Sequence, residues 1–305
     1  MTEKIGNVVM NYEFYDGEDL YSDGDMIENH ILNIVKTEEG YEYAHKDYGN
    51  WAVLYHLSRQ RENIVAPMDI GKEDDVLEIG AGMGAVTGAL ARKARKVDCI
   101  ELSKRRSMVN AYRHKNCDNI EIFVGNFQKI NIEKKYDVIT LVGVLEYGYH
   151  YINSDTPYED FIKKVSQCLK PNGKLYVAIE NKLGMKYLAG YHEDHLGKPY
   201  IGIEGYTKED NVKTFSHSQL KNLLLNNGFQ KTKFYYPFPD YKLPTVIYSD
   251  EDICKEKINF SSHCNYDMDV HQNFDQVKAF QSLEGAEEVK MLANSFLVEA
   301  CKEIG

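Results

Sequence analysis

The sequence predicts an α/β fold in which helices cover both faces of a doubly wound, mostly parallel sheet. From Asp74 onward, short apolar runs alternate with amphipathic stretches, as in consecutive strand–helix units. A glycine-rich loop, residues 80–84, lies where the first of these runs meets its helix. The chain has 305 residues, of which 43% are hydrophobic, so it can bury a core of this kind.

Apolar periodicity places the elements of this core. Short apolar runs predict strands, and the amphipathic stretches between them predict helices. Gly228 ends the last of these helices, because glycine is common just after a helix C-terminus, and the final strand is expected to be antiparallel. The predicted strands are 75–79, 96–101, 120–124, 136–142, 173–179, 230–236 and 295–299, and the predicted helices are 85–95, 105–114, 158–169 and 216–227.

The segments outside this alternation are predicted to be a cap and two lids. An acidic, glycine-punctuated opening precedes two stretches with helical spacing, which indicates a helical cap. Two later stretches are longer than ordinary connections, and connections of that length are typical of functional lids. The expected boundaries are 1–70 for the N-terminal helical cap, with helices from Met26 and over about 50–63, and 71–305 for the main domain, with lid-like insertions at about 181–214 and 239–291.

Charge and composition argue against several classes of partner. The net charge of −11 and the pI near 5.4 disfavour nucleic acid, which attracts basic proteins. No stretch approaches the ~18 apolar residues of a membrane span, and the N-terminus shows no secretory leader, so we expect a cytoplasmic protein. The six cysteines lack paired spacing, which is typical of reduced thiols.

The glycine loop predicts a site for a cofactor that contains adenosine. Glycines at Gly80 and Gly82 remove Cβ atoms, so the backbone can turn tightly and approach a ligand. Together with Ala85 they also fit the G-x-G-x-x-G/A pattern of dinucleotide-binding folds, so the loop alone leaves the cofactor open. Glu101, 21 residues beyond Gly80, can accept hydrogen bonds from the ribose hydroxyls of either cofactor.

The motifs around the loop resemble the class I S-adenosylmethionine-dependent methyltransferases. Glu78 lies two residues before the first glycine, and a Lys-Pro-Asn-Gly-Lys turn at 170–174 opens the fifth strand. The resemblance implies a Rossmann-like methyltransferase sheet with S-adenosylmethionine as the cofactor. Asn126 stands where these enzymes commonly have an acid against the adenine, and Phe127 can flank the ring. The implied cofactor-binding residues are Glu78, Gly80, Ala81, Gly82, Gly84, Glu101, Leu102, Asn126, Phe127, Gly143 and Glu146.

Two further segments resemble a bacterial subgroup of methyltransferases associated with polysaccharide and lipopolysaccharide biosynthesis. They are Glu-Asn-Lys-Leu-Gly at 180–184 and Tyr-Pro-Phe-Pro-Asp-Tyr-Lys-Leu-Pro at 236–244. The resemblance implies O-methylation of a sugar or nucleotide-sugar hydroxyl. The sequence also lacks an Asn/Asp-Pro-Pro-Tyr loop after the fourth strand, a feature of enzymes that methylate exocyclic base amines.

The acceptor is expected near the ends of the fourth and fifth strands. The sulfonium of the cofactor is already an activated electrophile, so the protein must mainly align the acceptor and exclude water, and a general base adds about 10²–10⁴-fold. In the segment 191–195, a carboxylate can orient a neighbouring imidazole. The same segment offers His192, Asp194 and His195 to Mg²⁺, but nothing in their spacing requires a metal and none is predicted. The candidate catalytic residues are His195, His192, Asp194, His150 and Glu180.

Other functions fit parts of the sequence. A partner protein that binds S-adenosylmethionine without turnover would keep the same fold, and a small-molecule amine could replace the hydroxyl as acceptor. An NAD-dependent oxidoreductase is disfavoured because no Tyr-x-x-x-Lys pair follows the fourth strand in helical register. The sequence determines neither the acceptor nor the oligomeric state.

Overall fold

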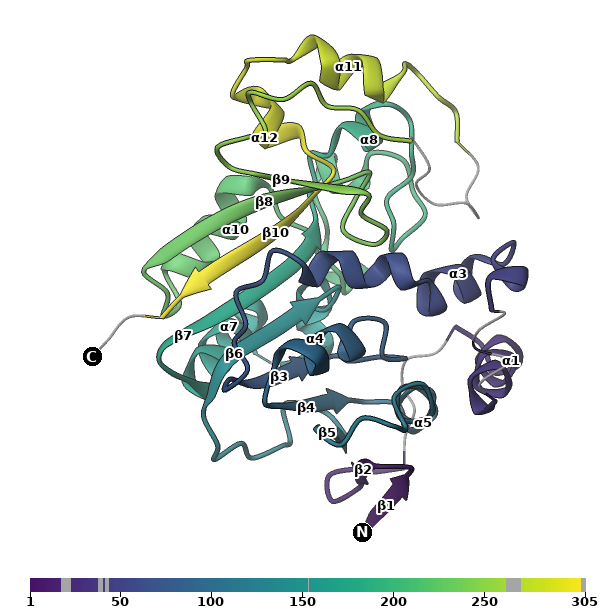
Figure 1. Ribbon diagram of the computed structural model, residues 1–305. Coiled ribbons are helices and arrows are strands. Elements are labelled where there is room, and N and C mark those ends of the chain that lie inside the picture. Colours follow the sequence, from purple (N-terminus) through teal and green to yellow (C-terminus); the bar gives the residue numbers. More distant parts are fainter. Residues whose placement is uncertain (18–22, 38–40, 42–43, 153, 262–269, 303–305) are drawn as a thin grey trace. The chain divides into compact units, whose positions relative to one another are not determined.

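The computed structural model confirms the α/β fold with a mostly parallel sheet (Figure 1). It describes residues 1–17, 23–37, 41, 44–152, 154–261 and 270–302, except for the side chains of 150 and 151. The chain divides into two compact units. The first unit comprises Met1–Leu141 and Cys168–Gly173, and the second comprises Val142–Gln167 and Lys174–Gly305.

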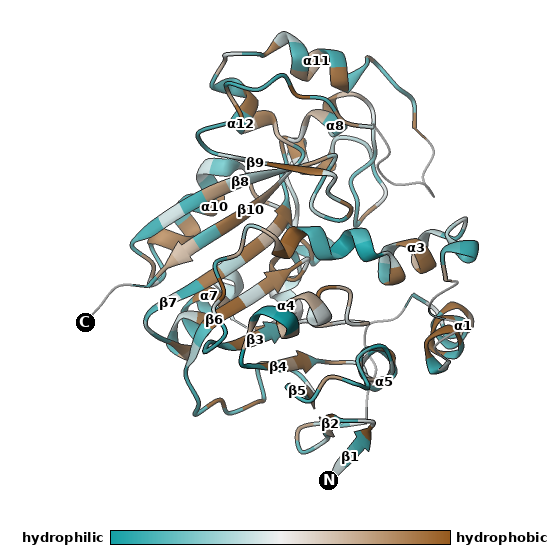
Figure 2. Cartoon of the chain, in the orientation of Figure 1, coloured by the Kyte–Doolittle hydropathy of each residue, from teal (hydrophilic) through white to brown (hydrophobic). Residues whose placement is uncertain are grey.

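The sheet of the first unit has the strand order β1-β2-β5-β4-β3-β6. All pairs from β2 to β6 are parallel. Every residue of β3 is buried, as is typical of a central parallel strand, and Figure 2 shows hydrophobic residues along the neighbouring strands. The predicted ranges are confirmed for β3 (Asp75–Ile79), β4 (Lys96–Glu101), β5 (Ile120–Val124) and β6 (Tyr136–Val142).

An N-terminal hairpin extends this sheet, and the sequence did not predict it. Strands β1 (Thr2–Ile5) and β2 (Val8–Asn11) pair antiparallel, and β2 pairs parallel with β5. The turn between them contains Gly6, whose φ is 60°. Only Ile5 of β1 is buried, so the strand has no apolar alternation by which it could be recognised.

Helices of the cap pack on the helix that follows β4. Helix α1 (Asp25–Lys36) begins one residue before the predicted Met26, and Gly24 occupies its N-cap position. The single helix expected over 50–63 is instead α3 (Trp51–Leu57) followed by a 3₁₀ segment, η2 (Arg59–Val65). The break lies at Ser58, whose hydroxyl accepts from the Gln60 backbone N–H at 3.2 Å. Other helical segments of this unit are η1 (Ala44–Asp47), α4 (Thr87–Lys93) and α5 (Lys104–Arg113), and the shared core contains Ile31, Leu32, Val35, Ala44, Val53, Leu57, Met83 and Val109.

The second unit contains an antiparallel sheet with the order β7-β10-β8-β9. The expected antiparallel last strand is confirmed as β10 (Ser295–Cys301). β7 (Leu169–Glu180) starts earlier than predicted, since the Pro-Asn-Gly turn lies within the strand. The other strands are β8 (Lys231–Phe238) and β9 (Val246–Ser249), and the larger helices are α7 (Pro157–Cys168) and α10 (His217–Leu225).

Both predicted insertions contain short helices of their own. In the first insertion these are α8 (Met185–Leu188), α9 (Ile201–Glu204) and η4 (Lys208–Asp210); in the second they are α11 (Gln276–Ser282) and α12 (Glu288–Leu292). Two further short segments, η3 (Leu145–Tyr147) and α6 (Gly148–Tyr151), follow β6. Within the described ranges, no helix has both the length and the hydrophobicity needed to cross a bilayer.

Candidate active site

The glycine loop after β3 has a backbone that glycine adopts readily. Gly80, Gly82 and Gly84 have φ values of 71°, 52° and 76°. At Gly82, no atom lies within 4 Å of the position that a Cβ would occupy. A Cβ on Gly84 would lie 2.3 Å from Oδ1 of Asn110, so this glycine permits close packing on α5. Gly82 therefore leaves open space for a ligand, whereas Gly84 fixes the loop to its support.

Two residues at the C-terminal end of α5 contact backbone carbonyl groups of the glycine loop. The Arg113 guanidinium donates to the carbonyl of Met83 at 2.7 Å, and Nε2 of His114 lies 3.0 Å from the carbonyl of Gly84. Burial and the neighbouring Arg113 lower the pKa of His114 to about 3, so its imidazole is neutral at physiological pH. The sequence did not identify either residue, because neither belongs to a recognisable motif.

Glu101, the last residue of β4, lies against the glycine loop. One carboxylate oxygen accepts from the Gly82 backbone N–H at 2.7 Å, and the other accepts from the Ser103 N–H at 2.8 Å. The side chain is therefore oriented by the backbone on both sides. A carboxylate in this position fits the two hydroxyls of a ribose, and together with the open space at Gly82 it fits an adenosine cofactor.

Glu78 is buried beneath the loop. Its carboxylate accepts from the Thr87 hydroxyl at 2.6 Å and lies 3.5 Å from Sγ of Cys99. Burial raises the pKa of Glu78 to about 7. These contacts connect β3 to the start of α4, and the cofactor-binding role of Glu78 stays a prediction.

The residues expected around the adenine have local contacts. Oδ1 of Asn126 accepts from the Gln128 backbone N–H at 2.8 Å, which stabilises a tight turn after β5. The ring of Phe127 is fully buried, and Ala81 is buried in the loop, whereas Leu102 is partly exposed. The roles of these residues toward the cofactor stay predictions.

A group of buried charged side chains lies in the second unit. It combines the end of β7 and the segment 145–147 with residues of the first insertion and the turn after β8. We call it the buried ionic cluster, and its members are Glu146, Glu180, Lys186, Glu193, Asp194, His195 and Lys242.

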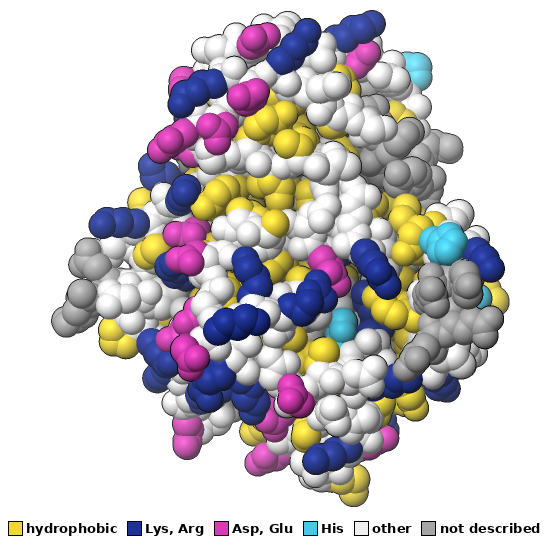
Figure 3. Space-filling model, in the orientation of Figure 1, with side chains coloured by type: hydrophobic (Ala, Val, Ile, Leu, Met, Phe, Trp, Pro, Cys, Tyr) yellow, Lys and Arg dark blue, Asp and Glu magenta, His cyan; other side chains and the backbone are white. Residues whose placement is uncertain are grey.

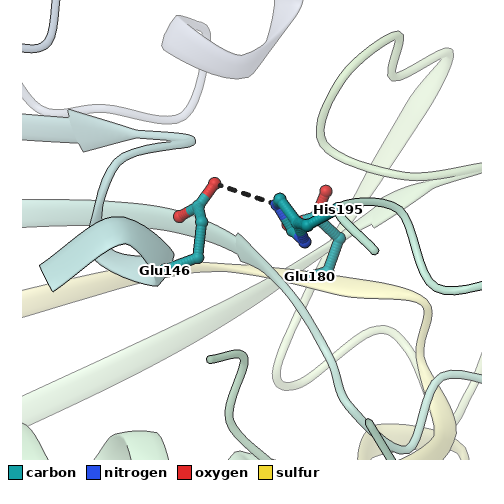
Figure 4. Close-up of side chains that lie close together, drawn as sticks. All are labelled: Glu146, Glu180 and His195. Carbon is teal, nitrogen blue, oxygen red and sulfur yellow. Dashed lines mark ion pairs between the residues drawn. The ribbon is translucent and has the colours of Figure 1, made fainter. Parts of the chain in front are cut away.

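His195 lies near three carboxylates, of which Figure 4 shows those of Glu146 and Glu180. Its Nδ1 is 2.7 Å from Oε1 of Glu193, while Nε2 is 3.6 Å from Oε1 of Glu146 and 3.9 Å from Oε2 of Glu180. Burial disfavours the charged imidazole, but the negative charges of Glu180, Glu146 and Glu193 outweigh it and hold the pKa of His195 well above its usual value.

Two lysines neutralise carboxylates on the other side of the buried ionic cluster. Nζ of Lys242 lies 2.6 Å from both Glu180 and Asp194, and Nζ of Lys186 lies 2.8 Å from Asp194. Burial opposes ionisation of Asp194, yet the two lysines hold its pKa well below the usual range. Burial also raises the pKa of Glu146, which has only His195 as a nearby cation among the partners that the structure gives it.

The structure brings together some of the predicted catalytic residues. Glu180, Asp194 and His195 lie in the buried ionic cluster, together with Glu146, which was expected near the cofactor. His192 contacts Pro199 in an isolated β-bridge, and none of its described contacts joins it to the cluster. The predicted His150 lies in α6, and its side chain is outside the described part of the structure.

The sequence missed Lys186, Glu193 and Lys242. The sequence did contain a signal for Lys242, because it lies in the segment 236–244, one of the two segments that resemble the polysaccharide-associated subgroup. The other segment, 180–184, contributes Glu180 to the cluster. Gly143 approaches the same region: its φ is 69°, and a Cβ there would lie 2.8 Å from the Tyr241 hydroxyl and 3.5 Å from Oε1 of Glu146. Its cofactor-binding role stays a prediction.

Comparison with known proteins identifies the class. Residues 77–175 match the model of a methyltransferase domain. The ubiquinone biosynthesis O-methyltransferase of Rickettsia prowazekii is 26% identical over 230 residues, which cover 71% of this chain and 87% of the relative. The ribosomal RNA small subunit methyltransferase A of Leuconostoc mesenteroides is 39% identical over 72 residues, or 24% of each protein. Ribosomal RNA methyltransferases are thus matched over 24–29% of their length.

Solved structures show the same fold. The Haemonchus contortus phosphoethanolamine N-methyltransferase 1, in complex with phosphoethanolamine and S-adenosylhomocysteine, superposes with a TM-score of 0.51 at 14% identity, over 93% of this chain and 52% of that one. A chain from the complex of the Haloferax volcanii Trm112 methyltransferase activator with a methyltransferase gives a TM-score of 0.52 at 14% identity, over 87% and 96%.

The family match and the glycine loop indicate that residues 77–175 form a methyltransferase domain of the class I S-adenosylmethionine-dependent type. The methyltransferase domain itself covers residues 77–175, and S-adenosylmethionine is its cofactor.

Proposed function

We propose that the chain methylates a small molecule, and that the acceptor is a hydroxyl of a sugar or nucleotide sugar. The observation that carries this proposal is the buried ionic cluster. A sugar hydroxyl is a weak nucleophile and loses its proton during transfer, so it needs a proton acceptor held in a water-poor site. The proposal includes a cytoplasmic location, because cysteines without paired spacing suit a reducing compartment.

The first unit supplies the cofactor site in this proposal. The loop backbone at Gly80 and Gly82 would hold the cofactor, and Glu101 would accept hydrogen bonds from its ribose hydroxyls. S-adenosylmethionine supplies the electrophilic methyl group. The remaining task of the protein is to align the acceptor oxygen with that methyl and to take up the proton.

Within the cluster, Glu146 is the proposed proton acceptor. His195 carries a proton because its pKa is well above the usual value, so it is a poor base and a good partner for an anion. Burial raises the pKa of Glu146, which makes this carboxylate a stronger base than an exposed one. Oε2 of Glu146 has no hydrogen-bond partner among the described atoms, so it can take up a proton without breaking an existing hydrogen bond.

Two further observations support a small hydroxyl acceptor. The relative from Rickettsia prowazekii, matched over most of its length, is an O-methyltransferase of ubiquinone biosynthesis. The segments 180–184 and 236–244 resemble the polysaccharide-associated subgroup, and both contribute to the cluster. On the face shown in Figure 3, basic and acidic side chains are interspersed, which gives no broad basic surface there for nucleic acid.

A small-molecule amine is the second candidate acceptor. The cluster contains the carboxylates of Glu146, Glu180, Glu193 and Asp194 against the cations of Lys186, His195 and Lys242, so it retains an excess of negative charge. A buried excess of carboxylate attracts a cationic amine. This candidate differs from the first in the atom that receives the methyl group.

The experiment is a methyl-transfer assay with the full chain and S-adenosylmethionine. Panels of sugars, nucleotide sugars and small amines are offered as acceptors, and release of S-adenosylhomocysteine is followed by mass spectrometry. Fragmentation of the methylated product identifies the atom that received the methyl group. We expect turnover with a hydroxyl acceptor and at least a 100-fold loss of kcat in Glu146→Gln. Methylation of an amine alone would favour the second candidate. Cofactor binding without turnover on any panel would contradict both.

A further inference from the structure

We propose that Glu146, Glu180 and His195 bind a divalent cation of the Mn²⁺ or Zn²⁺ type. One ligand atom from each residue lies within 4.8 Å of the other two. A cation with bonds of about 2.0–2.2 Å holds neighbouring ligand atoms roughly 3–4.4 Å apart. The distances from Nε2 of His195, 3.6 Å to Glu146 and 3.9 Å to Glu180, fall in this range.

The same distances are too long for direct hydrogen bonds. A protonated imidazole binds a carboxylate at about 2.7–2.9 Å, and His195 does so at Nδ1 with Glu193 but not at Nε2. Oε2 of Glu146 and Oε2 of Glu180 have no hydrogen-bond partner among the described residues, and both side chains are at most 1% exposed. Burying a carboxylate oxygen without a hydrogen bond is costly, and a cation between Glu146 and Glu180 would offset the cost for this pair of carboxylates.

His195 is oriented as a metal ligand would be. Metal-binding histidines commonly donate their second ring N–H to a carboxylate, which fixes the ring and leaves the other nitrogen for the metal. Glu193 provides this carboxylate at 2.7 Å from Nδ1. Glu193 is itself held by the backbone N–H groups of His195 and Leu196 at 2.8 and 2.7 Å and by the Tyr206 hydroxyl at 3.1 Å. Backbone and side-chain hydrogen bonds therefore fix Glu193, and Glu193 in turn fixes the orientation of the His195 ring.

The lysines of the cluster occupy its other side. Lys242 contacts Oε1 of Glu180 at 2.6 Å, while Oε2 of the same carboxylate faces His195. Asp194 contacts both Lys242 and Lys186 through separate oxygens. The carboxylate of Asp194 is therefore already paired with two lysines. The sequence offered His192, Asp194 and His195 as ligands of a metal, whereas the site proposed here takes its oxygen ligands from Glu146 and Glu180.

The donor set selects the ion. One imidazole nitrogen with two carboxylate oxygens suits Zn²⁺ or Mn²⁺, whereas Mg²⁺ prefers oxygen ligands and water. A bound ion would occupy the place of the Nε2 proton and lower the pKa of a hydroxyl that coordinates it. Oε2 of Glu146 would still be available as the proton acceptor. This catalytic role rests on the proposed function, but the binding of the ion does not.

The test uses the full chain, stripped with EDTA and exchanged into chelator-free buffer. Mn²⁺ is titrated in, free Mn²⁺ is measured by electron paramagnetic resonance, and Zn²⁺ is added as a competitor. We expect one Mn²⁺ per chain, displaced by Zn²⁺. Glu146→Gln and Glu180→Gln should each weaken Mn²⁺ binding at least tenfold, and Glu193→Gln should weaken it by about 10–100-fold through the orientation of His195.

Matched controls lie in the same insertion. His192→Gln removes a histidine three positions away, and Glu209→Gln removes an exposed carboxylate, so both should bind Mn²⁺ like the unmodified chain. Circular dichroism and thermal unfolding report whether each variant is folded. If Glu180→Gln does not fold, Glu146→Gln and Glu193→Gln decide the result.

Two outcomes would overturn the metal site: no stoichiometric binding of Mn²⁺ or Zn²⁺ by the folded chain, or undiminished binding in folded Glu146→Gln and Glu193→Gln. Metal binding is measured without turnover, so it can fail independently of the methyl-transfer assay. Metal binding without methyl transfer would contradict the proposed function only.

Discussion

The carboxylate of Glu101 accepts a hydrogen bond of 2.7 Å from the backbone N–H of Gly82, at the loop position with open space above it. The end of β4 and the loop after β3 are thereby joined at the point where a ribose is expected. The glycine loop, which would contact the cofactor through its backbone, therefore also orients the Glu101 side chain that would bind the ribose.

Glu101→Gln should weaken S-adenosylmethionine binding by about 10–100-fold, since a hydrogen bond to a charged group is worth roughly 1.5–3 kcal/mol. Isothermal titration calorimetry measures the affinity. Glu133→Gln, an exposed carboxylate of the same unit, is the control and should bind normally. If both variants bind S-adenosylmethionine with the same affinity, Glu101 does not contact the cofactor. Tight binding of NAD by the unmodified chain would contradict the cofactor assignment.

Alanine at Gly82 and at Gly84 should have different effects. Both substitutions strain a left-handed backbone by about 1–2 kcal/mol. Gly84→Ala also forces a Cβ against Asn110, so we expect it to destabilise the fold by an additional ~1–3 kcal/mol. Gly82→Ala meets no protein atom and should mainly reduce cofactor affinity. Urea unfolding and calorimetry separate the two effects; a larger loss of stability at Gly82 would contradict this assignment.

The stability of the first unit should depend on the ionisation of Glu78. Burial raises its folded pKa to about 7, above its unfolded value of about 4.3, so the folded state retains a proton that the unfolded state releases. This contribution is fully present below about pH 4 and is lost as pH rises to about 7.

Glu78→Gln removes the titration and keeps the size of the side chain. Relative to the unmodified chain, the variant should therefore gain stability between pH 5 and pH 8, by roughly 1–3 kcal/mol. Urea unfolding at both pH values gives the difference, with Glu133→Gln as the control. A difference between the chains that does not change with pH would show that Glu78 does not titrate in this range.

Lys186→Met should destabilise the second unit by about 3–5 kcal/mol, because it leaves the buried charges of Asp194 and Asp240 without one of their cations. Thermal unfolding measures the loss. Adding Asp194→Asn should restore part of the stability. Lys255→Met, at an exposed position, is the control. If the double variant is as unstable as the sum of its parts, the pair is not coupled.

Much of the fold could be predicted from the sequence because the central strands are short runs rich in buried apolar residues. The ranges of β3 to β6 follow from such runs; β3 and β4 are buried on both faces, whereas buried and partly exposed residues alternate along β5. The hairpin of β1 and β2 could not be predicted, since its first strand is mostly exposed and contains a single buried residue. The break at Ser58 interrupts a sequence with uniform helical spacing.

The candidate site was predictable only in part. Glu180 and His195 stand out as polar residues after a strand and in a long connection. Their partners Lys186 and Lys242 lie 56 positions apart in the sequence, and a lysine is ordinarily exposed. Only the fold shows that both are buried beside carboxylates, so the charge balance of the cluster could not be deduced from spacing.

The pairing of Lys186 and Asp194 also restricts how the first insertion can move. The two residues lie on either side of a short loop, and both are bound to the turn after β8, through Asp240 and Lys242 respectively. Lifting this loop would separate buried opposite charges, which is costly. We therefore expect residues 186–195 to keep their position relative to the turn after β8 when a ligand binds.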